Sequence, residues 1–249
     1  MFLKLIACNV FQREACYCLA RSPHIFDIEF TELGDHIHSD RLREGLQARI
    51  DAASKARPYD AILLLFGICG NATVGLQARN IPLVIPRAHD CCTILLGSRE
   101  LFKTHFKDAP STPFSSAGYM ERGDYYLRTN DGEQKVHYGD AYAEYVRQYG
   151  EDNAKYIWES MHPELPPDLE HKAVFIDLPE TSALGYADKF RARAEADGKK
   201  LLLLNGSLRL IRNLIDGAWS DEDFLQVPPG HKIAGLYDWT HIIQSVPNS

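Results

Sequence analysis

Residues 59–99, which read YDAILLLFGICGNATVGLQARNIPLVIPRAHDCCTILLGSR, decide the fold. The stretch contains apolar runs of strand length at 61–68 and 81–85, and a short turn of small and polar residues follows each run. Both runs are almost continuously apolar, as strands of a parallel sheet are when helices cover both faces. Residues 91–106, which come next, read as a helix. The stretch therefore predicts consecutive strand–helix units with parallel strands.

The same alternation extends along the rest of the chain. Further apolar runs predict strands at 3–7, 25–30, 173–178, 201–204 and 224–227. Helices are expected at 10–21, 40–56, 181–197 and 208–215. The pattern predicts an α/β fold with a Rossmann-like, mainly parallel sheet flanked by helices. We expect residues 1–249 to form a single α/β domain, built as one unit or as two or three packed βα lobes.

Residues 108–170 interrupt this alternation and read as an insertion. A hairpin is expected around Asn130-Asp-Gly132, and an aromatic-rich helix over 142–161. Its tyrosines have the spacing of one buried helical stripe, although the aromatic side chains could also line a pocket. Because long insertions in α/β folds are often functional, we expect residues 108–170 to cover the site.

The composition of the chain excludes several classes of protein. With 249 residues, of which 45% are hydrophobic and 24% charged, the chain is an ordinary globular one and is neither disordered nor fibrous. A net charge of −7 without a basic block argues against nucleic-acid or anionic-membrane binding. No apolar run reaches the roughly 18 residues of a membrane-spanning helix. We expect a cytoplasmic protein with a small-molecule substrate, and its oligomeric state stays open.

Cysteines stand where three predicted strands end. Cys8 follows the first strand, Cys69 follows the strand that begins at Ala61, and Cys91 follows the strand at 81–85, with His89 two residues before it. The carboxyl ends of parallel strands share one edge of a sheet, so the three thiols should meet there. The remaining cysteines, Cys16, Cys18 and Cys92, are expected to lie inside helices or the core.

Three thiolates, or two with the imidazole of His89, suit Zn²⁺ or an iron–sulfur cluster better than Mg²⁺ or Ca²⁺. In a reducing compartment these cysteines would not form disulfides. The alternative is that each cysteine is a small buried apolar residue, because free cysteine is among the most buried residue types. His36 and His38 form an H-x-H pair, and His38 is a possible further ligand, although exposed loop histidines are equally common.

Further polar residues surround the predicted site. Arg87 and Asp90 are the candidate catalytic residues: the arginine to bind a carboxylate or phosphate, and the aspartate to orient His89. Asp90 could equally be a helix N-cap, and Arg99 a surface ion-pair residue. The candidate substrate-binding residues are Asn9, Asn71, Thr73 and Arg99. No G-x-G-x-x-G, P-loop lysine or G-x-S-x-G is present, which argues against nucleotide binding and serine hydrolysis.

The segments 59–71, 83–91 and 95–99 carry the signature CGN…PRAHDC…LLGSR, which resembles a bacterial and archaeal family catalogued as a domain of unknown function. The resemblance extends to Cys8, to His38 with residues 42–50, and to residues 223–230, and so covers most of the chain. Members are encoded, in many genomes, beside corrinoid proteins and methyltransferases that demethylate methylated amines. The resemblance implies a role in one-carbon or methyl-group metabolism.

Two hypotheses of different classes follow. In the first, the chain is a metal-dependent transferase or lyase, in which Zn²⁺ activates a nucleophile for methyl transfer or polarises a substrate. An iron–sulfur cluster on the same cysteines, with one iron open to substrate, is a variant of this hypothesis. In the second, the chain is a non-catalytic accessory protein that binds a corrinoid or a corrinoid protein.

Overall fold

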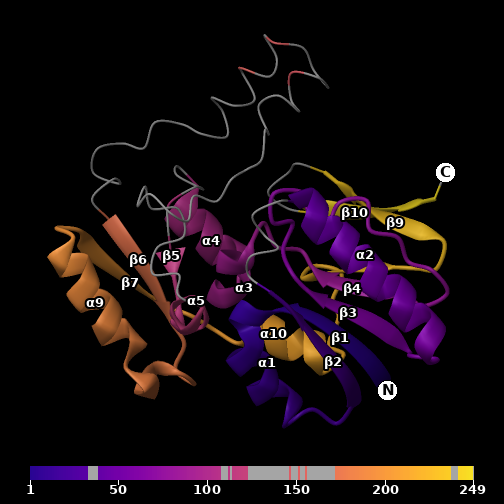
Figure 1. The fold of residues 1–249 in the computed structure, drawn as a ribbon, viewed down its shortest axis with the longest axis horizontal. Coiled ribbons are helices and arrows are strands. Elements are labelled where there is room, and N and C mark those ends of the chain that lie inside the picture. Colours follow the sequence, from indigo (N-terminus) through magenta and orange to yellow (C-terminus); the bar gives the residue numbers. More distant parts are fainter. Residues whose placement is uncertain are drawn as a thin grey trace.

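The computed structural model describes most of the chain (Figure 1). The described residues are 1–32, 39–107, 112, 114–122, 146, 151, 155, 172–236 and 241–248. The hairpin expected around Asn130 and the helix expected over 142–161 therefore lie almost entirely outside the described residues, and His36 and His38 lie wholly outside them.

The main sheet has five strands among the described residues, in the order β2-β1-β3-β4-β8. The strands are β2 (Ile25–Thr31), β1 (Phe2–Cys8), β3 (Ala61–Leu65), β4 (Leu83–Pro86) and β8 (Phe224–Val227). The first four are parallel, and β8 is antiparallel to β4. Every residue of β3 and β4 is buried, which explains why their sequences do not alternate between apolar and polar residues.

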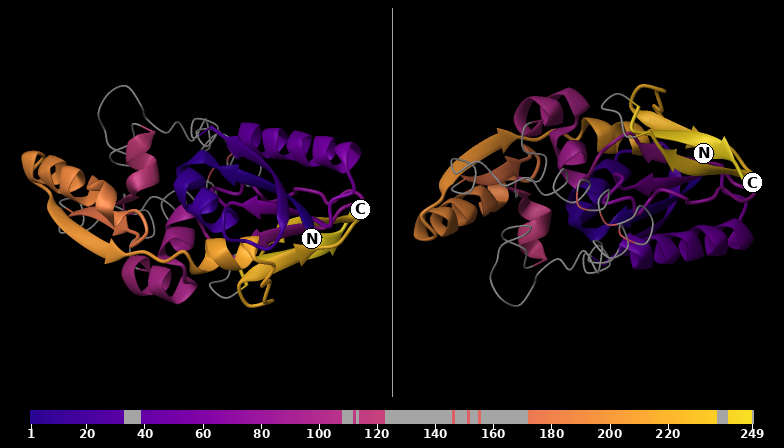
Figure 2. Two further views of the ribbon diagram at one scale, coloured as in Figure 1. Left: turned by 90° about the horizontal axis from the view of Figure 1, so that it is seen from below. Right: turned by 90° about the horizontal axis from the view of Figure 1, so that it is seen from above.

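Helices cover both faces of this sheet (Figure 2). They are η1 (Asn9–Phe11), α1 (Gln12–Leu19), α2 (Ser39–Ala56), α3 (Cys91–Leu96), α4 (Arg99–Phe106) and α10 (Arg209–Ile215). Helix α1 packs on α10, and α10 contacts β3 and β4, whereas α2 covers the opposite face. Opposite faces are expected because β1 has β2 on one side and β3 on the other, and right-handed crossovers then place successive helices on alternate faces.

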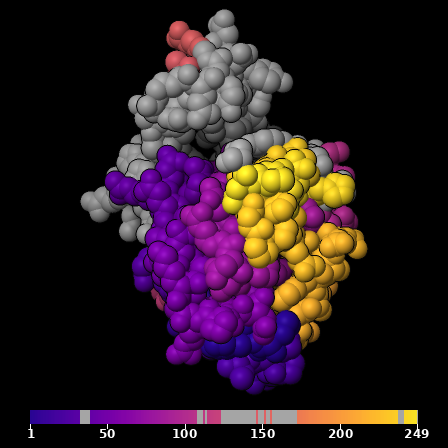
Figure 3. Space-filling model, turned by 90° about the vertical axis from the view of Figure 1, so that its right-hand side faces the viewer, coloured from indigo at the N-terminus to yellow at the C-terminus, as the bar shows by residue number. Residues whose placement is uncertain are grey.

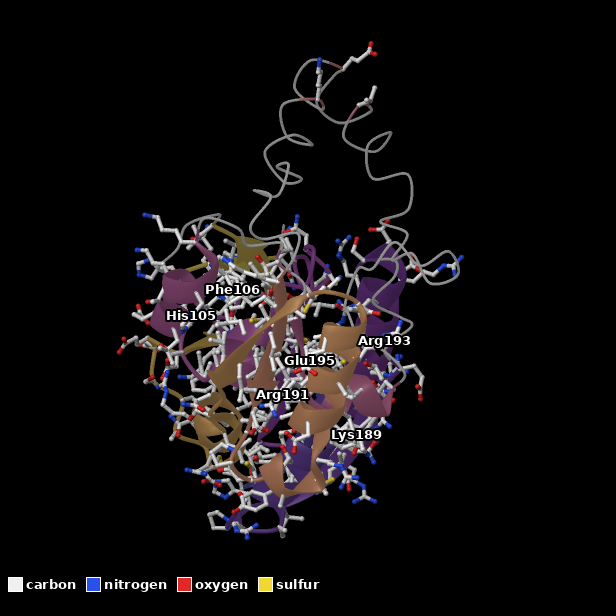
Figure 4. All side chains as sticks on the ribbon, turned by 90° about the vertical axis from the view of Figure 1, so that its left-hand side faces the viewer. His105, Phe106, Lys189, Arg191, Arg193 and Glu195 are labelled. Carbon is white, nitrogen blue, oxygen red and sulfur yellow. The ribbon has the colours of Figure 1, made fainter. Side chains whose placement is uncertain are left out.

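A second, smaller parallel sheet packs beside the first (Figure 1). It contains β5 (Phe114–Ser115), β6 (Lys172–Asp177) and β7 (Lys200–Asn205), with α5 (Ala117–Glu121), η3 (Ser182–Leu184) and α9 (Tyr186–Ala196). Buried residues of β6 and β7 belong to the same hydrophobic core as the main sheet. The outer side of α9 is charged and exposed, with Lys189, Arg191, Arg193 and Glu195 along it (Figure 4).

The C-terminal residues form a hairpin of β9 (His231–Gly235) and β10 (Ile243–Pro247). This hairpin, in yellow in Figure 3, contacts β8 of the main sheet, and a bridge joins Gln77 to Lys232. The described part of the chain contains no helix long and apolar enough to cross a membrane.

The predicted α/β fold with a mainly parallel sheet is confirmed, and each of the seven predicted strands is present. Several features differ from the prediction in detail. The strands near 173 and 201 belong to a separate sheet, the β9–β10 hairpin was not anticipated, and the helix expected over 91–106 is two helices. The break occurs at Gly97, whose φ of 70° ends α3 and whose Cα lies too close to Ser207 for any side chain.

Candidate functional site

The strand order places the cysteines at the topological switch point of the main sheet. The chain forms β2 on one side of β1 and then β3 on the other side. The direction in which strands are added to the sheet therefore reverses at β1. In open α/β sheets, ligands bind outside the carboxyl ends of the strands at such a point. Cys8 is the last residue of β1, and Cys69 lies just beyond the end of β3.

The three predicted cysteines come together at this edge. Cys91, the first residue of α3, has side-chain hydrogen bonds with the thiols of both Cys8 and Cys69. Its thiol also hydrogen-bonds with the phenol of Tyr119, which belongs to α5. Cys8 is fully buried, and Cys91 is only 3% exposed, whereas Cys69 is partly exposed. Cys69 is therefore the member of the thiol cluster, defined as Cys8, Cys69 and Cys91, that solvent reaches most easily.

The loops after β3 and β4 bring Cys69 and Cys91 together because they touch along their backbones. Cys69 N–H donates to the carbonyl of His89 at 3.1 Å, and a Cβ on Gly67 would lie 2.7 Å from the backbone of Asp90. Only glycine permits this approach. The chain then turns through a left-handed run at Cys69 (φ 47°), Gly70 (φ 64°) and Asn71 (φ 67°). A left-handed cysteine is uncommon, and such backbone strain is concentrated at functional sites.

Burial and mutual contact control the protonation of the cluster. The largest single influence on the pKa of Cys91 is a hydrogen bond from Cys69, which lowers it. The hydrogen bond to Cys8 and burial both raise the pKa, and together they outweigh that effect, so the net shift is upward. Burial first, and the nearby thiols second, also raise the pKa of the Tyr119 phenol well above its ordinary value. Without a bound cation, Cys91 and Tyr119 therefore keep their protons at neutral pH.

Tyr119 lies in the insertion that was expected to cover the site, but the sequence did not place its side chain at the thiol cluster. It is only 4% exposed, and its ring packs edge-on against Phe114 with centroids 5.4 Å apart. Helix α5 reaches the cluster because Gly118 lies directly on the carbonyl oxygen of Val10, where a Cβ would overlap that oxygen. A glycine before an aromatic residue was the available signal, but it does not say which strand end the aromatic side chain approaches.

Three buried polar atoms at the same edge have no hydrogen-bond partner among the described residues. They are Oδ1 of Asn9, Oγ1 of Thr31 and Oγ of Ser116. Thr31 is paired in register with Cys8 across the parallel strands, so their side chains project from the same face of the sheet. Buried polar atoms normally have partners, which makes this edge suitable for a polar ligand or ordered water. Asn9, a predicted substrate-binding residue, also donates through Nδ2 to Glu32 at 3.0 Å.

The structure gives both predicted catalytic residues structural contacts. Asp90 is the N-cap of α3, since its Oδ1 accepts from the backbone N–H of Thr93 at 3.0 Å. Arg87 donates to the backbone carbonyls of Asp221, His241 and Ile243, and so ties the end of β4 to the C-terminal segment. The capping alternative for Asp90 is thus present, and a catalytic role for either residue stays a prediction.

The other predicted site residues are distributed around the cluster. The ring of His89 stacks on Phe102 with centroids 5.6 Å apart. Thr73 is buried and its hydroxyl donates to the carbonyl of Gly67, so it supports the turn that carries Cys69. The carbonyl of Asn71 accepts from Arg43, and Arg99, the first residue of α4, is partly exposed. Because His38 lies outside the described residues, its role as a ligand stays a prediction.

The donor chemistry of the cluster suits a thiophilic metal. Sulfur is the preferred donor for Zn²⁺, Cu⁺ and iron–sulfur clusters. Within the described ranges, no group of three or more His, Cys, Asp or Glu side chains is already arranged to hold a metal ion. Metal binding by the three thiols therefore stays a prediction.

The remaining cysteines lie outside the cluster, as expected. Cys92 is buried in α3, and burial raises its pKa well above the usual value. Cys18 is buried under α10, and burial raises its pKa to about 11. Cys16 is exposed on α1 and serves below as a matched control.

Comparison with protein families gives one match. The family model described as a protein of unknown function (DUF1638) matches residues 30–215, which is most of the chain. The chain belongs to the DUF1638 family. The matched stretch includes Cys69, Cys91 and Tyr119, whereas Cys8 precedes it. No curated protein and no solved structure matches the chain.

Proposed function

We propose that this DUF1638 protein is a metal-dependent enzyme that acts on a small molecule at the thiol cluster. The observation that carries the proposal is that Cys8 and Cys69 both hydrogen-bond with Cys91 at the switch point of the sheet. Buried apolar cysteines would not need to meet at this one edge. The unpartnered atoms of Asn9, Thr31 and Ser116 provide polar groups for a ligand beside the sulfurs.

In this proposal Cys8, Cys69 and Cys91 hold the metal, either Zn²⁺ or the iron of an iron–sulfur cluster. When bound, the metal supplies a Lewis acid that activates a nucleophile or polarises a substrate. The chain itself holds the sulfurs in place, excludes water through the buried β1 and α3, and leaves Cys69 as the side open to substrate. Three protein ligands leave room for a substrate atom, as in catalytic zinc sites.

The direction of the chemistry rests on the family resemblance. Genomic association with corrinoid proteins and methyltransferases favours methyl transfer in one-carbon metabolism, in which a thiol or another nucleophile accepts a methyl group from a methylated donor, which leaves as the demethylated product. Corrinoid would then be reached through a partner protein. The alternative is that the metal-loaded protein has no turnover and serves as an accessory that binds a corrinoid protein.

The first test is metal and acid-labile sulfide analysis of protein purified without oxygen, together with its ultraviolet–visible spectrum. About one equivalent of zinc without sulfide, or iron with sulfide, is the expected result. Cys69→Ser and Cys91→Ser should lose the metal, whereas Cys16→Ser, which removes an exposed thiol from α1, should retain it. A metal-free wild-type protein, or full metal content in Cys69→Ser, would overturn the proposal.

The second test separates the enzyme from the accessory protein. Metal-loaded protein is incubated with methylated small molecules and a thiol acceptor, with and without a methylated corrinoid, and products are followed by mass spectrometry. Product formed by the wild type and not by Cys91→Ser supports the enzyme. Tight binding of corrinoid or a corrinoid protein without any product supports the accessory role.

A further inference from the structure

Neither packing nor helix formation requires a tyrosine at position 119. Helix α5 is only five residues long, yet it places a phenol against the Cys91 sulfur from a segment far away in the sequence. The ring is held by Phe114, and the helix is held by the contact between Gly118 and Val10. A phenylalanine would fill the same space, so the hydroxyl has a separate role.

Among the described residues, the hydroxyl hydrogen-bonds with the Cys91 sulfur, and the thiols of Cys8 and Cys69 lie near it. The phenol O–H is the donor of this pair and the sulfur atom the acceptor, because a thiol is only a weak donor. A buried O–H with one acceptor has a defined direction, because turning away would leave it unpaired.

We infer that Tyr119 is a positioning residue of the thiol cluster, and that its phenol donates a hydrogen bond to the Cys91 sulfur in the metal-bound protein. The inference rests on the proposed function, since it concerns the same sulfur as a ligand. Hydrogen bonds to ligand sulfur reduce the negative charge on that sulfur and fix its orientation. Tyr119 would thereby hold Cys91 on the metal and reduce the reactivity of its sulfur, leaving substrate chemistry to the Cys69 side.

The test compares Tyr119→Phe with wild type after loading with Co²⁺, whose thiolate charge-transfer band reports directly on the electron density at sulfur. Loss of the O–H should move that band to lower energy and speed metal release to a chelator by roughly tenfold or more, because hydrogen bonds to charged acceptors are strong ones. The control is Tyr186→Phe, which removes another phenol O–H, the one that donates to Glu121 at 3.0 Å. That variant should keep the wild-type band and release rate.

A spectrum and release rate in Tyr119→Phe equal to those of wild type, with metal still bound, would overturn the inference and leave the proposed function standing. If wild-type protein binds no metal, the proposed function fails instead. The contact is then read from the infrared S–H stretching band of the metal-free protein. A shift of that band in Tyr119→Phe and not in Tyr186→Phe shows the Tyr119–Cys91 hydrogen bond without any metal, and an unchanged band refutes it.

Discussion

Glu14 gives the sharpest test of the packing around α1. Its side chain is only 1% exposed, and neither carboxylate oxygen has a hydrogen-bond partner in another described residue. The cost of burying the charged form raises the pKa of Glu14 from 4.5 to about 7. The nearby charged groups are Glu121 on α5 and Glu180 after β6, which add to the shift, and Arg13, which opposes it. Arg13 is itself paired with Glu121 at 2.5 Å.

The sign of the effect on stability follows from proton binding. The folded protein binds the Glu14 proton more tightly than the unfolded chain, so ionisation favours unfolding. The penalty is absent below the unfolded pKa of 4.5, grows as pH rises, and is complete above about 7. Each unit of pKa difference corresponds to about 1.4 kcal/mol, so the full penalty is about 3 kcal/mol.

The perturbation is Glu14→Gln, which keeps the shape of the side chain and cannot ionise. At pH 8 the variant should have a free energy of unfolding about 3 kcal/mol above that of wild type, equivalent to a melting temperature roughly 6 to 12 °C higher. Near pH 4.5 the two proteins should converge. Urea unfolding followed by circular dichroism at several pH values measures the difference, with exposed Glu195→Gln on α9 as the control that keeps the wild-type pH dependence. Parallel stability curves for Glu14→Gln and wild type between pH 5 and 8 would refute the argument.

Two further substitutions test how the site is built. Gly118→Ala should displace α5 from Val10, lower the free energy of unfolding by roughly 1 to 3 kcal/mol or more, and reduce metal content. Gly185→Ala, at φ 72° with open space around it, is its control and should cost only about 1 kcal/mol of backbone strain in urea unfolding, with metal content unchanged. Asp90→Ala removes the N-cap bond to Thr93 and should lower the free energy of unfolding by about 1 kcal/mol in the same assay. An Asp90→Ala midpoint equal to that of wild type contradicts the capping role.

Local sequence was sufficient for the elements and for part of the site. Apolar runs such as 61–68 and 81–85 indicated strands covered on both faces, and the observed β3 and β4 are buried throughout. The meeting of Cys8, Cys69 and Cys91 followed from one rule, that the carboxyl ends of parallel strands share an edge. Asp90 as an N-cap was likewise visible in the sequence, because capping depends on the next three residues alone.

Other features depended on contacts between residues far apart in the chain. Nothing near Tyr119 indicates that α5 lies against the turn after β1, because that packing depends on a close contact between Gly118 and Val10. The assignment of β6 and β7 to a second sheet is equally nonlocal, since their apolar runs resemble those of the main sheet. Likewise, Glu14 reads as an ordinary surface residue of α1 until the residues around it are known.

The sequence by itself determined the positions of the strands, the α/β class and the edge at which the thiols gather, because periodicity and strand direction are local properties. The tertiary structure alone decided which side chains complete the thiol cluster and, among the described residues, which carboxyl is buried without a partner in another residue. Those outcomes depend on how separate elements pack against each other. Packing is set by the shapes of both contacting surfaces, and any one segment of sequence supplies only one of the two.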